Sequence, residues 1–256
     1  MTREDFHVLR AGTMAEHNLN TAGITKMSER EILEEFQALS DKVAVQKHMI
    51  PAEVLSQQLA PNEYGYQQGI SVVLNSDMIK PDTLNEPETL NEMIDTVYHE
   101  NSHLRDFQAS FLSEVREQMT PEELAGLNDR LSEISDDSWE SYYNHPGEVA
   151  AREMGRMGIE EVKNDQHLIA EIDAEMNGGR NQILATFDFA VVNGEVVYDE
   201  DIFEMSNTLE SQTTDTFSMQ TLVDNDGMIE VDENELEMDT MDAVDDFSFS
   251  AFDEDV

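Results

Sequence analysis

The basic residues of this 256-residue chain stop at Arg180, and their uneven distribution limits which part of the chain can fold. All 14 Lys and Arg residues lie between Arg3 and Arg180, whereas residues 181–256 carry 22 of the 57 acidic residues and no basic one. A segment with so much uncompensated negative charge repels itself and buries an apolar core poorly. We therefore expect the compact domain within the first 180 residues and an acidic, largely disordered tail over residues 207–256.

The negative charge also limits the partners of this protein. At pH 7 the net charge is −43, and such a field repels the phosphate backbones of nucleic acids while it attracts cations and basic polypeptides. No apolar run approaches the roughly 20 residues that span a bilayer, so we expect no membrane partner. The N-terminal residues lack the apolar stretch of a signal peptide, which predicts a cytoplasmic protein and leaves delivery by a specialised system as the alternative.

Hydrophobic periodicity predicts an α+β fold in which helices dominate. Ser28 and Glu31 fit a capping box at the start of the first strongly periodic segment. The dipeptide Asn193-Gly194 is one that two-residue hairpin turns prefer, whereas residues 51–69 carry Pro, Asn and Gly and are predicted to be loop. The predicted helices cover residues 28–47, 88–119, 122–134 and 146–162, and the predicted strands cover residues 69–74, 187–192 and 195–198.

His99, Glu100 and His103 form an HExxH pattern inside the best-defined predicted helix. Residues four positions apart lie on one face of a helix, so both imidazoles can reach the same metal ion. The glutamate between them is then placed to take a proton from water bound to that metal. Because the chain has no cysteine, any metal must be held by His, Asp or Glu. The pattern therefore predicts a zinc site, and a surface helix with two incidental histidines is the alternative.

A catalytic zinc ion needs a third protein ligand and an open position for water. A metzincin arrangement would require Gly and His at the positions of Asp106 and Ala109, so this class of metallopeptidase is excluded. Glu148 is the preferred third ligand because it lies in the first turn of a later predicted helix, and His145 is the reserve candidate. Arg152, four residues after Glu148, is expected to orient that carboxylate.

Other side chains near these ligands have predicted roles. Tyr143 and His145 are candidate catalytic residues that would stabilise the oxyanion of a tetrahedral intermediate. Tyr142 is predicted to pack in the core or at its rim. Asp106, close to one turn beyond His103, is expected either to support that ligand or to lie on a solvated helix face.

Two motifs together resemble a known class of enzymes. The sequence HENSH at residues 99–103, followed by YYNHPGEVAAR at residues 142–152, resembles the gluzincin-type metallopeptidase domains of bacterial mobile elements, phage polyvalent proteins and polymorphic toxins. Those families pair HExxH with a downstream PxExxA or GExxAR helix, and the resemblance covers about residues 68–160.

The resemblance implies a zincin-like fold and a complete catalytic set. It implies that His99, His103 and Glu148 bind Zn²⁺, that Glu100 is the general base, and that the reaction is hydrolysis of a peptide bond in a polypeptide substrate. It also implies that the strand beside the active-site helix serves as an edge on which substrate adds by β-augmentation. That role would fall to Ile70, Val72 and Leu74.

The fold class expected from these observations is α+β, a mostly helical minimal zincin-like metallopeptidase domain with a short β-sheet and an acidic tail. Four parts of the chain are predicted. They are an N-terminal helical segment at residues 1–67, the zincin-like core at 68–180, a β-hairpin extension at 181–206 and the disordered tail at 207–256.

The acidic tail contains a partial match to a calcium-binding EF-hand loop. Asp224, Asp226 and Glu233 occupy ligand positions, but the first position, which is normally Asp, is Leu222. A weak Ca²⁺ site is therefore one expectation for this segment. Its interspersed Leu, Met and Phe residues favour binding of a protein partner or masking of the chain's own site.

Two other functions compete with peptide hydrolysis. The first is an acidic interaction or inhibitor protein whose helices merely resemble the motif, and it predicts no bound metal. The second is a zinc-binding protein without catalytic activity, and it predicts bound metal without hydrolysis. Processing of mobile-element proteins and a delivered toxin remain equal alternatives for the biological role.

Overall fold

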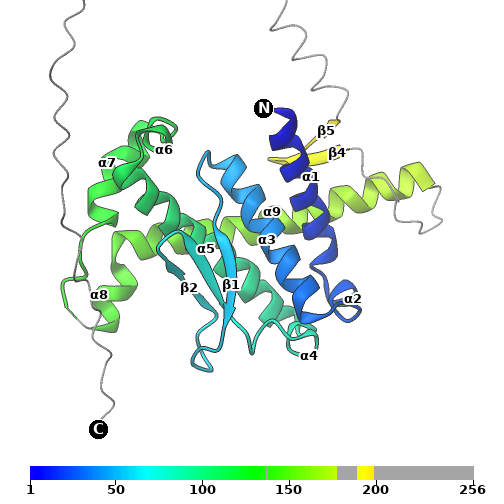
Figure 1. Ribbon diagram of the computed structural model, residues 1–256, viewed down its shortest axis with the longest axis horizontal. Helices are drawn as coiled ribbons and strands as arrows, with labels where there is room; N and C mark the ends of the chain where they lie inside the picture. The colour runs from blue at the N-terminus through cyan, green and yellow to red at the C-terminus, as the bar shows by residue number, and fades with distance from the viewer. Residues whose placement is uncertain (137, 178–188, 199–256) are drawn as a thin grey trace, which may run out of the picture. The chain divides into compact units, whose positions relative to one another are not determined.

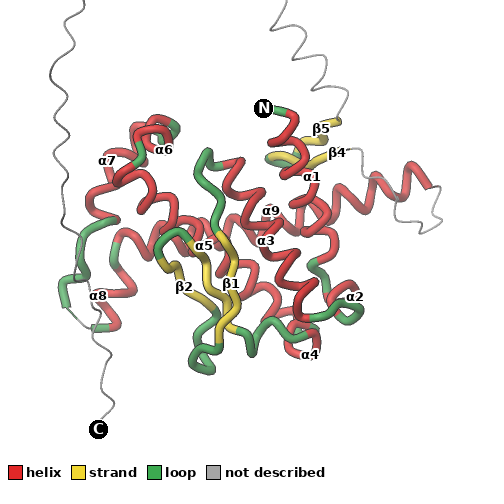
Figure 2. The backbone as a smooth tube through the Cα atoms, in the orientation of Figure 1, coloured by secondary structure: helices red, strands yellow, loops and turns green. Residues whose placement is uncertain are grey.

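The computed structural model describes residues 1–136, 138–177 and 189–198 of the chain, which form an α+β fold dominated by helices (Figures 1 and 2). The expected fold class is confirmed at this level. The elements, in chain order, are α1 (Arg3–Asn18), α2 (Thr21–Ile24), α3 (Glu29–Gln46), β1 (Glu53–Gln57), β2 (Gly65–Gln68), β3 (Ser71–Asn75), α4 (Pro81–Leu84), α5 (Pro87–Phe111), α6 (Ser113–Glu117), α7 (Pro121–Arg130), α8 (Trp139–Asn144), α9 (Pro146–Asn177), β4 (Phe189–Val192) and β5 (Glu195–Tyr198).

Helix starts follow local sequence rules. The capping box predicted at Ser28 is confirmed, because its hydroxyl accepts from the backbone N–H of Glu31 and the Glu31 carboxylate accepts from the backbone N–H of Ser28. The helices α5, α7 and α9 each begin at a proline, which suits the first turn because its missing N–H would have no helical partner there.

Three helices differ in length from the prediction, and the helix predicted over residues 122–134 is α7, which ends at Arg130. The segment expected to be one helix over residues 88–119 breaks at Leu112, whose backbone is extended, and continues as the short α6. The last long helix, α9, runs to Asn177 and not to residue 162. Apolar residues on its buried side continue from Val162, at the predicted end, to Ile169, and they keep this helix packed on its neighbours.

The three-stranded sheet has the order β1-β3-β2, with β1 parallel to β3 and β2 antiparallel to it. The strand predicted around residues 69–74 is β3, and it is the central strand of this sheet. The prediction that Ile70, Val72 and Leu74 form a substrate edge is therefore wrong, since both sides of β3 already pair with other strands. Val72 and Leu74 are fully buried, and Ile70 lies in the turn between β2 and β3.

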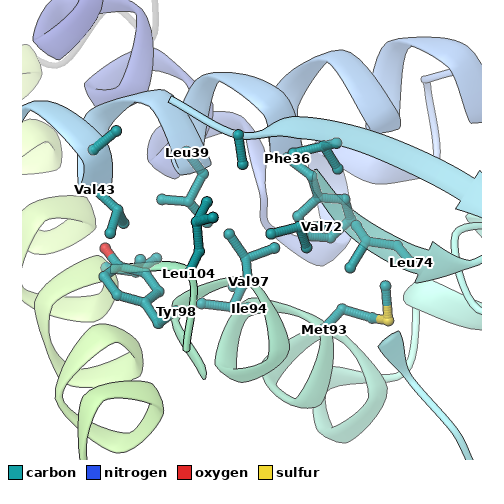
Figure 3. Packing of buried hydrophobic residues seen from close by; sticks show 14 of the residues in the cluster. Phe36, Leu39, Val43, Val72, Leu74, Met93, Ile94, Val97, Tyr98 and Leu104 are labelled. Atoms are coloured by element: carbon teal, nitrogen blue, oxygen red, sulfur yellow. The ribbon is translucent and has the colours of Figure 1, made fainter. Parts of the chain in front are cut away.

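The main core lies where α3, β3 and α5 meet. Figure 3 shows this packing, to which α3 contributes Phe36 and Leu39 and α5 contributes Val97. The boundary predicted between residues 67 and 68 falls inside β2, and buried residues on both sides of it belong to the same cluster. The other labelled members in Figure 3 are Val43, Val72, Leu74, Met93, Ile94, Tyr98 and Leu104.

Small residues let α9 pack closely on α5. Ala151 is fully buried, Gly155 lies against the carboxylate of Asp95, and Gly158 lies against the ring of Tyr98. A Cβ atom at either glycine would overlap these side chains, and at Gly158 the buried ring of Tyr98 leaves room only for glycine at this helix separation. The close packing holds the first turn of α9 near the middle of α5.

A fully buried lysine ties α1, α3 and α9 together. The amine of Lys42 lies 2.6 and 2.7 Å from the two carboxylate oxygens of Glu16 and 2.7 Å from Asp165. Glu161 lies farther away, at 3.7 Å, and is partly exposed. All of these contacts are charge-assisted, and they satisfy the lysine in a position without solvent.

The hairpin of β4 and β5 packs on α1. Asn193 and Gly194 both have positive φ, at 52° and 77°, as the type I′ turn predicted from this dipeptide requires. The backbone N–H of Val191 donates to the hydroxyl of Thr13 at 2.8 Å, and Ala190 packs with Phe6 and Leu9. Residues 207–256, predicted to form the tail, lie outside the described part of the chain. Among the described helices, none combines the length and the apolar character needed to cross a bilayer.

Candidate metal centre

The helix α5 places two imidazoles side by side. His99 and His103 are separated by one turn, and their Nε2 atoms lie 3.1 Å apart with the rings edge to face. Both side chains are mostly buried against α9. The HExxH spacing therefore has the structural consequence predicted for it, because both ring nitrogens reach the same small volume.

Glu148 joins these imidazoles from the first turn of α9. Its Oε1 lies 3.3 Å from Nε2 of His103 and its Oε2 lies 3.4 Å from Nε2 of His99. One donor atom from each of the three residues falls within 4.8 Å of the others. The structure thus brings together the three residues that the sequence predicted as metal ligands, although 45 positions separate Glu148 from His103.

The electrostatics of this group favour an ionised carboxylate. Burial opposes ionisation of Glu148, but the imidazoles of His103 and His99 hold its pKa well below the usual value for glutamate. The pKa of His103 lies above the usual value for histidine. Burial would lower this pKa, but Glu148 and Glu100 raise it by more. Without a metal ion, the negative charge of the Glu148 carboxylate is therefore balanced by the imidazole of His103, which holds its proton more strongly than usual.

The donor set fits a zinc ion. Two imidazole nitrogens and one carboxylate oxygen are the ligand types of His₂Glu catalytic zinc sites, which leave a fourth position open. Within the described residues, Oε2 of Glu148 is buried and has no hydrogen-bond partner. A cation between the three donors would supply the partner that this buried oxygen lacks.

Glu100 lies in the position expected for a general base. It is almost completely buried, and its Oε1 is 3.9 Å from Nε2 of His99. Burial raises its pKa, while the nearby imidazoles and a hydrogen bond from the backbone N–H of Gln67 partly oppose the increase. A carboxylate with a raised pKa is a better proton acceptor near neutral pH than an exposed one.

The strand β2, and not β3, provides a free edge at this site. The backbone N–H of Asn75 donates to the carbonyl of Tyr64, so these two residues are a hydrogen-bonded pair. In an antiparallel ladder, hydrogen-bonded pairs alternate with pairs that are not hydrogen-bonded. By this alternation Gly65 and Gln67 turn their N–H and C=O groups away from β3. Since β2 is the outer strand of the sheet, these groups face the cleft beside α5.

Asp106 is fixed by an arginine that the sequence prediction did not include. Arg130 donates to its carboxylate through Nε at 2.6 Å and Nη2 at 2.9 Å. Asp106 is buried, and its negative charge contributes to the raised pKa of His103. It therefore faces the site, and the alternative of a solvated helix face is wrong.

Three predicted roles do not agree with the side-chain positions. Tyr143 does not line the cleft, because its ring stacks under the guanidinium of Arg152, 3.9 Å from the ring centroid. Arg152 donates to the backbone carbonyl of Tyr143 and is not hydrogen-bonded to Glu148. The imidazole of His145 contacts Ser132 and accepts from the backbone N–H at the start of α9, so it caps this helix.

Tyr142 takes the place predicted for Tyr143. Its phenol lies beside Glu148, and burial together with the charge of that carboxylate raises its pKa. The two tyrosines are neighbours on the short helix α8, where successive side chains point about 100° apart. Sequence alone could not decide which of them faces the candidate metal ligands.

The candidate ligands, Glu100, Asp106 and Tyr142 surround one open cleft of about 420 Å³. The sequence prediction missed seven of its twelve lining residues, because most of the missed residues come from weakly patterned segments or from the ends of short helices. The predicted members are His99, Glu100, His103, Asp106 and Glu148, and the others are Gly65, Tyr66, Gln67, Phe107, Arg130, Leu131 and Tyr142.

The function has to be argued from the geometry of this cleft, because similarity to known proteins does not indicate one. The weak calcium site predicted at Asp224, Asp226 and Glu233 lies outside the described residues and adds nothing to the identification. No protein-family model matches the chain, and neither the curated proteins nor the solved structures contain a significant match.

Proposed function

We propose that this protein is a zinc-dependent peptidase with a gluzincin-type site. One observation carries the proposal: Glu148 of α9 meets the two imidazoles of α5 in an open cleft, with Glu100 buried beside them. This arrangement would hold a zinc ion with three ligands and leave a position open for water, with a proton acceptor beside it. The zincin-like fold and the resemblance to proteins of mobile elements belong to the same proposal.

Each residue then has a defined task in hydrolysis. A bound zinc ion would act as a Lewis acid and lower the pKa of water. Glu100 removes the proton from the attacking water and transfers it to the amine that leaves. Tyr142 donates a hydrogen bond to the oxygen that becomes negative as the peptide carbonyl is attacked.

The free edge of β2 would bind the backbone of the substrate. Gly65 and Gln67 present peptide groups toward the cleft, and an extended chain can pair with them as an added strand. Glu100 now accepts from the N–H of Gln67, so this contact has to be exchanged when substrate pairs there. The strong negative charge of the protein favours basic polypeptides in the approach to this edge.

Zinc content tests the site directly. Purified wild type is expected to hold about one zinc ion per chain after reconstitution, and His103→Ala and Glu148→Ala are expected to lose it. His167→Ala and Glu153→Ala are matched controls, because these side chains are exposed on α9 and should leave zinc binding unchanged. A wild type that binds no zinc would overturn the proposal and favour the acidic interaction protein.

Hydrolysis is tested separately with Glu100→Gln. This variant should keep its zinc and lose cleavage of a broad peptide library, since glutamine cannot accept the proton from water. Equal cleavage by the variant and the wild type would exclude Glu100 as the base. Bound zinc with no cleavage by the wild type would instead identify a zinc-binding protein without catalytic activity.

A further inference from the structure

An apolar wall of three side chains lines the same cleft as the candidate metal ligands. It consists of Phe107, Leu131 and the ring of Tyr142, which come from α5, the end of α7 and α8. Their exposed fractions are 38%, 41% and 39%, so each leaves a large apolar surface in contact with water. Three such surfaces around one opening form a site that gains free energy when another apolar group covers it.

This apolar wall lies directly beside the proposed ligands. Phe107 follows His103 by four residues on α5, which places their Cβ atoms about 6 Å apart on one helix face. Tyr142 reaches the wall from the other direction, with its phenol next to Glu148. An apolar group on the wall is therefore within one residue of a peptide bond held at the metal centre.

Contacts with neighbouring residues support the wall. Arg130, the residue before Leu131, is clamped to Asp106 by two hydrogen bonds of 2.6 and 2.9 Å. The ring of Tyr142 is supported by Trp139, with the ring centroids 5.6 Å apart. Because Arg130 and Asp106 are already paired before any ligand arrives, the adjoining Leu131 needs little ordering when one binds.

The charges at the base of the wall cancel. Arg130 and Asp106 neutralise each other, and Arg130 also donates to the backbone carbonyl of Glu123. Neither group is therefore free to pair with a charged side chain of a substrate. The wall favours large apolar or aromatic side chains and offers little to acidic or basic ones.

The direction of β2 explains how a substrate would reach the wall. Glu100 lies next to Gln67 of β2, while Phe107 lies about two turns farther along α5. An extended peptide on the β2 edge has side chains that alternate between its two faces. One of the residues next to the bond at the metal centre would then point its side chain to the wall.

We propose that Phe107, Leu131 and Tyr142 form a specificity subsite that selects a large apolar or aromatic residue adjacent to the cleaved peptide bond. The inference rests on the proposed function, because it assumes that a peptide bond is cleaved at the metal centre. The subsite itself binds peptide whether or not cleavage follows. The substrate class is a polypeptide that presents such a residue in an extended segment.

Kinetics on matched peptides test the subsite in the zinc-loaded full chain. A positional library should show that the wild type prefers Phe, Leu or Met over Ala at one position next to the cleaved bond. Leu131→Ala and Phe107→Ala should each lower kcat/KM on the preferred peptide about 10-fold or more and change little on its Ala counterpart. Leu124→Ala is the control, because this leucine on α7 is similarly exposed, at 39%, and does not line the cleft. Equal effects of Leu131→Ala and Leu124→Ala, or equal cleavage of Phe and Ala peptides, would overturn the proposal.

A binding measurement separates failure of the subsite from failure of the peptidase. Trp139 is the single tryptophan of the chain and contacts Tyr142 of the wall, so its fluorescence reports on occupation. Zinc-loaded Glu100→Gln is titrated with two nonapeptides that differ only by Phe or Ala at the centre. At least 10-fold tighter binding of the Phe peptide, lost in Glu100→Gln/Leu131→Ala, supports the subsite even if the wild type cleaves nothing. Equal binding of both peptides would overturn the subsite and leave the zinc and hydrolysis tests unaffected.

Discussion

The ring of Tyr98 on α5 lies directly against the backbone of Gly158 on α9. Tyr98 is fully buried, so its ring cannot move away to admit a larger residue. This contact lies in the helices that carry His99 and Glu148. The separation of these helices therefore controls both the stability of the fold and the geometry of the candidate metal site.

Replacing Gly158 by alanine should destabilise the fold and weaken zinc binding. Overpacking costs about 1–3 kcal/mol, which exceeds the gain of roughly 0.5–1 kcal/mol from removing a helical glycine. The urea midpoint and the zinc dissociation constant measure the two effects. Met157→Ala, at a half-exposed neighbouring position, is the control. It should change neither the urea midpoint nor the zinc dissociation constant by a similar amount. An unchanged midpoint for Gly158→Ala would mean that the two helices pack less closely than described.

Glu16 should make the protein less stable as the pH rises from about 5 to 8. Burial and the nearby carboxylate of Asp165 raise its pKa to about 8, although Lys42 opposes the shift. The folded state therefore holds a proton that the unfolded state has lost, and this stabilisation is complete below pH 4.5 and disappears as the pH passes 8. Glu16→Gln keeps an acceptor for Lys42 but cannot titrate.

The expected result is a flatter pH dependence in Glu16→Gln than in the wild type. Urea unfolding at pH 5, 6, 7 and 8 gives the free energy of unfolding for each protein. Glu34→Gln serves as the control, since its carboxylate forms only an exposed pair with Arg30 and should follow the wild type. Parallel curves for Glu16→Gln and the wild type would show that Glu16 does not hold this proton.

Lys42 should be essential for the docking of α1. Lys42→Met leaves the carboxylate of Asp165 buried without a cation and Glu16 without its hydrogen-bond donor, and loss of one partner from a buried ion pair costs about 3–5 kcal/mol. Lys80→Met, which removes an exposed pair with Asp77, should leave the unfolding midpoint near that of the wild type. The triple variant Lys42→Met/Glu16→Gln/Asp165→Asn should recover much of the loss. No recovery would mean that the packing of the lysine chain, and not its charge, holds α1.

The parts of the fold that sequence could predict are those with a strong local pattern. The helix α3 has apolar residues at regular spacing and a capping box, and α5 has the same spacing around HExxH. The hairpin depends on Asn193-Gly194, whose conformational preference is local. In each case the physical cause lies within a few neighbouring residues, so one sequence is sufficient.

The sheet was mostly missed because its outer strands carry no apolar alternation. β1 reads EVLSQ and β2 reads GYQQ, and of these nine residues only Val54 is buried. Their place is set by pairing with β3, which is a long-range interaction. The edge was consequently expected on β3, the one strand with a clear β-branched pattern, and its real position became visible only with the strand order.

The three candidate metal ligands could be found from the sequence, while their surroundings could not. HExxH and the carboxylate near Pro146 are sequence patterns with a spatial meaning. The pairing of Arg130 with Asp106 and the burial of Lys42 between two acids depend on how helices pack, and charged residues in a helical pattern are normally expected on its solvated face. Sequence therefore located the centre of the site but not its walls.

The choice between two adjacent tyrosines gives a direct test of the proposed chemistry. Tyr142 lines the cleft beside Glu148, and its raised pKa keeps the phenol protonated and able to donate at neutral pH. Tyr143 instead covers Arg152 outside the cleft. If Tyr142 supports the developing oxyanion, Tyr142→Phe should lower kcat by roughly 10²–10³-fold while zinc content stays the same. The substitution removes only the hydroxyl, so the apolar ring of the wall remains and KM should change little.

Tyr143→Phe provides the matched control on the same helix, and its kcat should equal that of the wild type. Steady-state kinetics of both variants on one cleaved peptide, with zinc measured in the same samples, distinguish the outcomes. If Tyr143→Phe were the slower enzyme, α8 would have to turn in the bound state and bring the other phenol to the substrate. If both variants kept full activity, neither hydroxyl would contact the oxyanion, and its stabilisation would fall to the metal ion and to the backbone N–H groups of β2.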